Sequence, residues 1–248
     1  MIPKKKSLGQ NFLTDKNILE LEAKLLDSKH KIVLEIGAGD GRLTEILSKQ
    51  NPKRIYAVEK DSRFAGLLQD KFCCVGEQVI VLEGDFLKME LPTFDVAVGN
   101  IPYYISSAII FRLAVLPIEM AVLVVQKEFA QKMVAKPGEK NYGRLSVTAQ
   151  VAFDIRLERI IPSHLFKPRP KVDSALIVLK PTGKILARHE QEIIRYLFSH
   201  KNQTVRNALL HSGVSKEKIA KLGDIAKERA RTLTKEQCLE IAEKISLV

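Results

Sequence analysis

Ile32-Val33-Leu34-Glu35-Ile36, followed by Gly37-Ala38-Gly39-Asp40-Gly41, is the stretch that decides the fold. A short apolar run leads into three glycines at alternate positions and then into an amphipathic segment through Leu47. This pattern predicts a strand, a tight loop and a helix. Glycines let a ligand approach the backbone, and a helix amino terminus offers unpaired N–H groups. Because the spacing differs from the usual dinucleotide fingerprint, the loop alone favours nucleotide cofactors and S-adenosylmethionine about equally.

Two acidic residues follow the next two predicted strands. Glu59 ends the strand Arg54–Val58, where a carboxylate can accept hydrogen bonds from both hydroxyls of a ribose. Asp85 follows the strand Val79–Glu83, where it can accept from an adenine amine. A single acidic residue after a strand is more often a helix cap or a turn residue. The glycine loop and both acids together favour a cofactor site, because ligands of open α/β sheets bind along the carboxyl edge.

A turn of the form Asn100-Ile101-Pro102-Tyr103 comes after the fourth predicted strand, Phe94–Val98. Pro102 fixes one torsion and lacks an N–H, so the turn can present the Asn100 side-chain oxygen and the Ile101 carbonyl to one point. Two such acceptors suit the exocyclic amine of a flat base, and Tyr103 offers a ring on which the base can stack. An isolated turn of this kind is usually only a surface turn. Its place on the same sheet edge as the glycine loop instead predicts that cofactor and base meet there.

These motifs resemble those of a known family, the S-adenosylmethionine-dependent ribosomal RNA adenine dimethyltransferases, and more narrowly the small-subunit enzymes that dimethylate two adjacent adenines. The resemblance runs from Lys6 to about Leu210. The departure nearest the catalytic turn is Ala108, where the family commonly has proline. The blocks that carry the resemblance are Lys6–Leu13, Glu35–Gly41, Asn100–Tyr103, Gln126–Ala130, Tyr142–Val147 and Phe166–Ser174.

The resemblance implies S-adenosylmethionine as cofactor, S-adenosylhomocysteine as product, and no metal. Phe166 would stack on the target base opposite Tyr103, although its residue type and position fit a plug at the end of a hairpin equally well. The predicted catalytic residues are Asn100, Ile101, Pro102, Tyr103 and Phe166. The predicted cofactor-binding residues, of which the first two rest on the resemblance alone, are Asn11, Leu13, Gly37, Gly39, Glu59, Asp85 and Asn100.

A net charge of +11 at pH 7 predicts a polyanionic partner, although many basic residues only solvate a surface. With the resemblance, the expected partner is small-subunit ribosomal RNA within an assembling small ribosomal subunit. The run Lys4-Lys5-Lys6 is not followed by an apolar signal segment, and three cysteines fit neither a disulfide framework nor a zinc site. We therefore expect a monomer in the cytoplasm that does not enter a membrane.

Alternating apolar runs and amphipathic stretches predict a doubly wound, Rossmann-like α/β sheet. The runs Ile155–Ile161 and Ala175–Leu179 predict an antiparallel hairpin at one sheet edge. The composition changes near Lys184, which divides the chain into a methyltransferase domain, residues 1–183, and a helical RNA-contacting or ribosome-contacting domain, residues 184–248. Thr234 with Gln237 three residues later predicts a capping box at the start of the last helix.

Three other functions remain open on the sequence. A DNA adenine methyltransferase can use a similar catalytic turn. A large-subunit ribosomal RNA methyltransferase of the macrolide-resistance type shares the cofactor blocks, although the blocks Tyr142–Val147 and Phe166–Ser174 argue against it. A ribosome-assembly factor that acts mainly by binding needs no active turn, so the intact Asn100 motif argues against pure binding.

Overall fold

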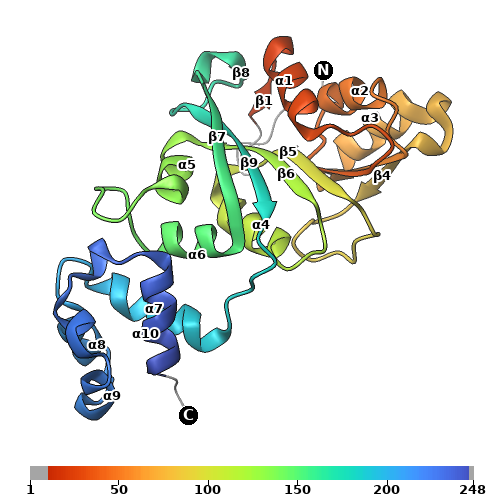
Figure 1. Ribbon diagram of the computed structural model, residues 1–248. Helices are drawn as coiled ribbons and strands as arrows, with labels where there is room; N and C mark the ends of the chain where they lie inside the picture. The colour runs from red at the N-terminus through yellow and green to blue at the C-terminus, as the bar shows by residue number, and fades with distance from the viewer. Residues whose placement is uncertain (1–10, 246–248) are drawn as a thin grey trace. The chain divides into compact units, whose positions relative to one another are not determined.

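The computed structural model describes residues 11–245 (Figure 1). Residues 6–10, which belong to the opening motif, lie outside this described part. The chain divides into two compact units. Unit 1 comprises Met1–Ala130 and Arg156–Pro181, and unit 2 comprises Gln131–Ile155 and Thr182–Val248.

Within residues 11–245, the main sheet has seven strands and is mixed, as the sequence predicted. The first five strands across the sheet are parallel neighbours, and β9 runs antiparallel to β6. Their apolar runs are buried because helices cover the sheet. From one edge to the other the strands are β4 (Val79–Glu83), β3 (Arg54–Glu59), β2 (Ile32–Ile36), β5 (Val96–Asn100), β6 (Met120–Gln126), β9 (Ser174–Pro181) and β7 (Phe153–Ile161).

The order of the parallel strands reverses between β2 and β5. From β2 the chain moves outward to β3 and β4, and then returns to β5 on the other side of β2. A reversal of this kind leaves a crevice at the carboxyl ends of the two central strands, where ligands of open α/β sheets bind. The glycine loop follows β2 and the Asn100 turn closes β5, so both open on this crevice.

Strand β5 begins and ends two residues later than the sequence suggested. The prediction was Phe94–Val98, whereas the strand covers Val96–Asn100. The Asp95 carboxylate, which precedes the strand, accepts a hydrogen bond from the Ile32 N–H at 2.7 Å. This side-chain contact fixes the entry to β5, and the later end makes Asn100 the last residue of the strand.

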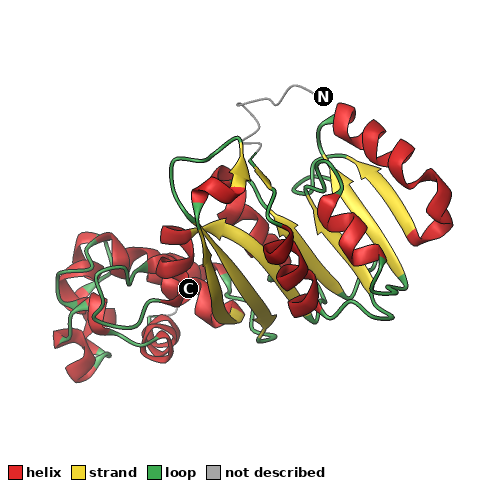
Figure 2. Cartoon of the chain, turned by 90° about the horizontal axis from the view of Figure 1, so that it is seen from above, coloured by secondary structure: helices red, strands yellow, loops and turns green. Residues whose placement is uncertain are grey.

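Helices lie on both faces of the sheet (Figure 2). Helices α1 (Lys16–Leu26), α2 (Arg42–Ser48) and α3 (Ser62–Phe72) share one apolar core with residues of the sheet. Helix α4 (Ser106–Leu113) connects β5 to β6, in the direction opposite to the β2-to-β3 connection. Because such crossovers are right-handed, α4 belongs on the other face.

A two-residue ladder joins distant parts of unit 1. Strand β1 (Phe12–Leu13) pairs antiparallel with β8 (Phe166–Lys167), so that Leu13 lies opposite Phe166. The Thr14 N–H and hydroxyl both donate to the Leu165 carbonyl at 2.9 Å. The ladder therefore brings the start of the described chain to the proline-containing loop.

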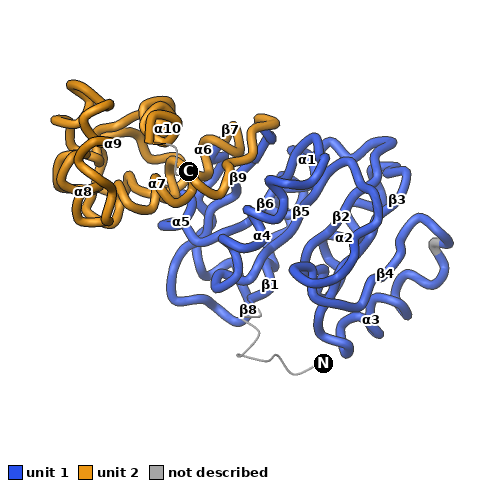
Figure 3. Tube along the Cα trace, turned by 90° about the horizontal axis from the view of Figure 1, so that it is seen from below, with its two compact units in different colours: residues 1–130, 156–181 blue, residues 131–155, 182–248 orange. Residues whose placement is uncertain are grey.

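Unit 2, which is orange in Figure 3, has an apolar core of its own that its helices supply in large part. Residues 131–155, which were expected to belong to the first domain, pack with the C-terminal helices. The reason is visible at Tyr142, which is buried and whose hydroxyl donates to the Leu233 carbonyl at 2.7 Å. Besides residues 153–155 of β7, the unit contains the end of α5 (Lys127–Val134) and the helices α6 (Arg144–Ala152), α7 (Arg188–Ser199), α8 (Val205–His211), α9 (Lys216–Ala220) and α10 (Lys235–Lys244).

The predicted capping box of α10 is confirmed. The Thr234 hydroxyl accepts from the Gln237 N–H at 3.2 Å, and the Gln237 side chain accepts from the Thr234 N–H at 2.8 Å.

None of the helices between residues 11 and 245 combines the length and the apolar character that crossing a membrane requires. Short 3₁₀ helices occur at η2 (Cys73–Gln78), η3 (Tyr103–Ile105), η4 (Ser163–Leu165), η5 (Gly223–Lys227) and η6 (Ala230–Thr232).

Candidate active site

One cavity of unit 1 brings all the predicted site residues together. It lies at the carboxyl ends of the central strands and is closed by residues of the β1–β8 ladder. Within residues 11–245, no cluster of His, Cys, Asp and Glu side chains is arranged to hold a metal ion. The predicted residues that line the cavity are Asn11, Leu13, Gly37, Gly39, Glu59, Asp85, Asn100, Ile101, Pro102, Tyr103 and Phe166.

The glycine loop needs glycine for its backbone and for space. Gly37, Gly39 and Gly41 have φ values of +76°, +58° and +75°, a region that other residues rarely adopt. A Cβ atom on Gly39 would lie 2.6 Å from the Cε1 atom of Phe12. Phe12, which lies between the predicted site residues Asn11 and Leu13, therefore packs directly on the loop.

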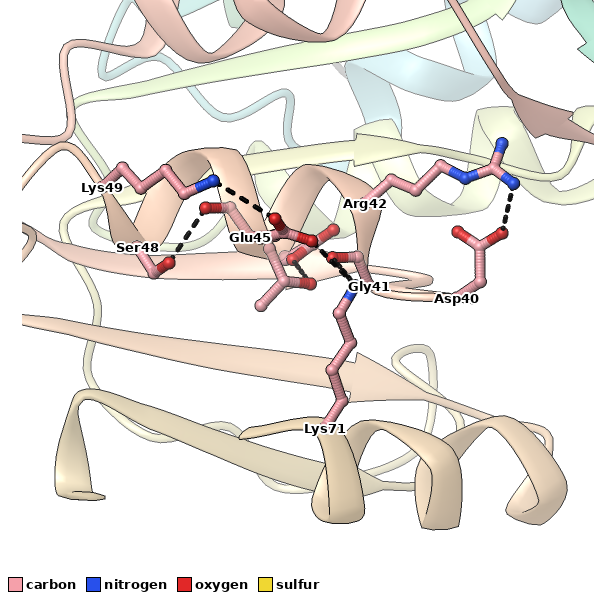
Figure 4. Close-up of polar contacts among 9 residues, drawn as sticks. Asp40, Gly41, Arg42, Glu45, Ser48, Lys49 and Lys71 are labelled. Atoms are coloured by element: carbon pink, nitrogen blue, oxygen red, sulfur yellow. Dashed lines mark hydrogen bonds and ion pairs between the residues drawn. The ribbon is translucent and has the colours of Figure 1, made fainter. Parts of the chain in front are cut away.

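Basic side chains hold the exit of the loop in place (Figure 4). The Lys71 ammonium, which extends from α3, donates to the Gly41 carbonyl at 3.3 Å and pairs with Glu45 at 3.1 Å. Arg42 pairs with Asp40 of the loop at 3.2 Å. These contacts connect the loop to two helices, which fixes the backbone around the glycines.

Glu59 is buried beside the glycine loop, with 8% of its surface exposed. One carboxylate oxygen accepts from the Gly39 N–H and the other from the Asp61 N–H, each at 2.8 Å. Burial raises the pKa of Glu59 above its ordinary value, and these N–H donors counteract part of that rise. Because each oxygen can accept a second hydrogen bond, Glu59 can still bind a pair of hydroxyls.

Asp85 already has a basic partner in this structure. The Lys60 ammonium lies 2.9 Å from one carboxylate oxygen, and the Leu87 N–H donates to the other at 3.0 Å. The Lys60 contact holds the pKa of Asp85 below its ordinary value. An adenine amine that binds to Asp85 must therefore share the carboxylate with Lys60, a neighbour that the local sequence pattern does not predict.

The Asn100 turn lies very close to the glycine loop. A Cβ atom on Gly99 would stand 2.4 Å from the Ile36 carbonyl oxygen, so only glycine permits this approach of β5 to β2. The Asn100 Nδ2 group donates to a carboxyl oxygen of Glu22 at 3.3 Å. Among the described residues, the buried Oδ1 atom of Asn100 has no hydrogen-bond partner. A buried acceptor without a partner is uncommon and indicates a place that a ligand donor can fill.

Tyr103 and Phe166, the two residues predicted to hold the base, are among the aromatic residues that line the same cavity. The Tyr103 hydroxyl forms a 2.7 Å hydrogen bond with the buried Ser174 hydroxyl, which restrains the ring. Phe166 is 3% exposed and belongs to the apolar core while also lining the cavity. The stacking role of both rings stays a prediction.

A family model, described as ribosomal RNA adenine dimethylase, matches residues 1–247 of the chain. The chain belongs to this family. A relative from Thermococcus onnurineus, named as a probable ribosomal RNA small subunit methyltransferase A, is 42% identical over 94% of this chain and 89% of its own length. The relative of the same name from Pyrococcus furiosus is 37% identical over 95% and 90% of the two chains.

Solved structures agree with the family. A dimethyladenosine transferase from Plasmodium falciparum has a TM-score of 0.83 and 28% identity, and covers 93% of this chain and 95% of its own. The 23S rRNA methyltransferase ErmE has a TM-score of 0.71 and 28% identity, covering 96% and 100% of the two chains. The predicted Rossmann-like methyltransferase fold is thus confirmed, and the protein is a methyltransferase of the ribosomal RNA adenine dimethylase family.

The sequence did not predict that Glu22 and Glu35 form a pair of buried acidic residues beside the cavity. Glu22 lies on the otherwise apolar side of α1 with Ile18, Ala23 and Leu26. An acidic residue among the apolar positions of a helix is the feature of the sequence from which a special role of Glu22 could have been predicted. Glu35, which lines the cavity, accepts a hydrogen bond from the Thr44 hydroxyl at 2.6 Å.

Glu35 makes the stability of the fold depend on pH. Burial raises the pKa of this carboxyl from 4.5 to about 8, although the bond from Thr44 opposes the rise. Between these values the folded protein holds a proton that the unfolded chain has lost, so raising the pH favours unfolding, by about 1.4 kcal/mol per pH unit for one proton. Glu35→Gln removes this contribution. We expect the unfolding free energy of the variant, measured in urea, to rise relative to wild type between pH 5 and 8; a constant difference would contradict the assignment.

Proposed function

We propose that this protein transfers methyl groups from S-adenosylmethionine to the exocyclic amines of two adjacent adenines in small-subunit ribosomal RNA. The observation that supports this function most directly is the Oδ1 atom of Asn100, which is buried and has no hydrogen-bond partner among residues 11–245. It belongs to a residue that lines the same cavity as the glycine loop and Glu59. An acceptor without a donor, next to a nucleoside-type site, suits a substrate that brings an amine.

The residues around the glycine loop fit a cofactor with a nucleoside and an amino-acid end. A Cβ atom on Gly37 would meet only the Asn100 carbonyl oxygen, at 4.0 Å, so a ligand can approach the backbone there. Glu59 keeps acceptor capacity for the ribose hydroxyls. Asp85 is the acceptor for the adenine amine of the cofactor, and Asn11 and Leu13 stand at the methionine end. When bound, S-adenosylmethionine supplies a methyl group activated by the positive charge on sulfur and is left as S-adenosylhomocysteine.

The Asn100 turn aligns the amine that is to be methylated. An amine conjugated to an aromatic ring is a poor nucleophile because its lone pair is delocalised. Acceptance of its two hydrogens by Asn100 Oδ1 and the Ile101 carbonyl favours the geometry in which the lone pair is free to attack. Pro102 fixes the turn, and Tyr103 and Phe166 hold the two faces of the flipped-out base.

The proton that the nitrogen loses needs no dedicated base. After the new N–C bond has formed, the nitrogen carries a positive charge and its remaining hydrogens are strongly acidic, so one proton can pass to solvent. A second methylation leaves a single N–H for two acceptors, and the monomethylated amine must rotate to offer it. Neither methyl transfer requires a histidine or a metal ion.

A second candidate is a large-subunit ribosomal RNA methyltransferase, because ErmE resembles this chain over nearly its whole length. The names of the relatives favour the small subunit. The relatives at 37–42% identity that are described above carry the small-subunit name.

The expected surroundings follow from this function. The net charge of +11 suits a ribosomal RNA surface. We place the protein in the cytoplasm as a monomer that acts on an assembling small subunit, with unit 2 contributing RNA or ribosome contacts. The protein is also an assembly factor if an Asn100→Ala variant still binds such subunits after methylation is lost.

The deciding experiment compares substrates in parallel. The protein is incubated with labelled S-adenosylmethionine and unmodified small ribosomal subunits, large subunits or duplex DNA, and the labelled nucleoside is identified by mass. We expect dimethyladenosine from small subunits alone. If label appeared only in large subunits or in DNA, the role of the catalytic turn would stand but the proposed substrate would be wrong. No label with any of the substrates would refute the proposed function.

A further inference from the structure

Glu22 is a buried carboxyl group that has no basic partner in the part of the chain that the structure describes. None of its surface is exposed, and among the described residues it takes part in no ion pair. Its Oε2 atom accepts a hydrogen bond from Asn100 Nδ2 at 3.3 Å, while Oε1 is buried and has no partner within residues 11–245. Helix α1 thus supplies a polar contact to a residue 78 positions further along the chain.

An apolar residue at position 22 would suit the core better. The neighbouring buried residues of α1 are Ile18, Leu19, Ala23 and Leu26, and burying an unpaired polar group costs free energy. Burial and the nearby Glu35 raise the pKa of Glu22 well above its ordinary value, which favours the neutral acid. A neutral carboxyl group still has a carbonyl oxygen that accepts from the Asn100 amide.

The side-chain amide of Asn100 has two different ends. Its Nδ2 group donates hydrogen bonds, and its Oδ1 atom accepts them. If the amide turned over, Nδ2 would face the hydrogens of the substrate amine and two donors would meet. The orientation of this amide therefore decides whether the turn attracts or repels the amine.

We propose that Glu22 is a positioning residue that holds Asn100 by Nδ2 and thereby leaves Oδ1 available for the adenine amine. The proposal rests on the methyl-transfer function given above, since it explains how the acceptor of that function is oriented. Glu22 does not touch the substrate or the cofactor in this account. It acts through Asn100, so its effect must disappear when Asn100 is absent.

The test compares two variants of Glu22 with a matched control. Glu22→Met keeps the length of the side chain without an acceptor, and Glu22→Gln restores a carbonyl oxygen. The control is Ser28→Ala, which removes a buried 2.7 Å hydrogen bond to Gln50 just after the same helix, away from the cavity. All proteins are tested with small ribosomal subunits for kcat, for the KM of S-adenosylmethionine and for melting temperature.

We expect Glu22→Met to lower kcat about tenfold, the effect of losing one buried hydrogen bond, with the KM of S-adenosylmethionine unchanged. Its melting temperature should equal or exceed that of wild type. Glu22→Gln should recover most of the activity, Ser28→Ala should keep wild-type kcat, and Glu22→Met should have no further effect in an Asn100→Ala background. Wild-type kcat in Glu22→Met, or a loss that follows melting temperature, would overturn the positioning role.

A second measurement is independent of activity. In the ¹⁵N spectrum the side-chain amide signals of Asn100 are identified by their loss in Asn100→Ala. We expect the Asn100 NH₂ protons to exchange slowly with solvent in wild type and at least tenfold faster in Glu22→Met, because the hydrogen bond that protects them is lost. Equal exchange rates in the two proteins would overturn the proposal. If wild type methylates none of the substrates, the proposed function fails while this spectrum still decides on Glu22.

Discussion

Alanine at position 100 is expected to lower the rate constant of methyl transfer by a factor of about 10²–10³, the range found when one preorganised polar group is removed from an active site. Asn100→Ala deletes the acceptor that is buried without a partner, while Glu59 and the glycine loop keep their contacts. The affinity for S-adenosylmethionine should therefore change little. Single-turnover kinetics with small ribosomal subunits measure the first quantity, and calorimetric titration with the cofactor measures the second.

The matched control for this variant is Asn17→Ala. Asn17 is an exposed residue of α1, and its replacement should leave both quantities at the wild-type value. A wild-type rate in Asn100→Ala would defeat the alignment role of the turn. A large loss of cofactor affinity with an unchanged rate constant would indicate that Asn100 binds the cofactor and not the substrate.

Replacing Gly99 by alanine is expected to destabilise unit 1 by about 3 kcal/mol, the upper part of the range for overpacked sites. The added Cβ atom would lie 2.4 Å from the Ile36 carbonyl oxygen and 3.3 Å from the Ile36 Cβ atom. A backbone carbonyl within a parallel sheet cannot turn away as a flexible side chain can, so β5 must separate from β2. Urea unfolding of wild type and variant measures the loss.

Gly66→Ala is the control for this second variant. Gly66 lies inside helix α3, and a Cβ atom built there meets nothing within 4 Å. Alanine in a helix interior is favoured over glycine, so we expect this variant to be more stable by about 0.5–1 kcal/mol. Equal stabilities of Gly99→Ala and wild type would show that the two central strands can separate without cost.

The carboxyl edge of the sheet could be predicted because its signals are local. The apolar run before the glycines, the acid after β3 and the Asn-Ile-Pro-Tyr turn each lie within a few residues. Strand β4 was predicted with the observed bounds, Val79–Glu83. The local pattern predicted the bounds of β5 less well, because the start of this strand depends on the contact of Asp95 with a strand 63 residues earlier.

Contacts between distant segments could not be predicted in the same way. The bond from Tyr142 to Leu233 spans 91 residues, and it helps to place residues 131–155 with the C-terminal helices. The pair Lys60–Asp85 depends on how two neighbouring loops face each other. Glu22 is noticeable in the sequence as an acid among apolar helix positions, but its contact with Asn100 could not be predicted without the folded structure.

The β1–β8 ladder sets a limit on when this protein can become active during its own synthesis. It joins Phe12 and Leu13 to residues 166–167, which leave the ribosome much later. The strands that carry the glycine loop and the catalytic turn emerge earlier, yet the cavity between them stays without this cover until the chain has grown past Lys167. A nascent chain can thus form the crevice early, but it completes the enclosure only after about two thirds of translation.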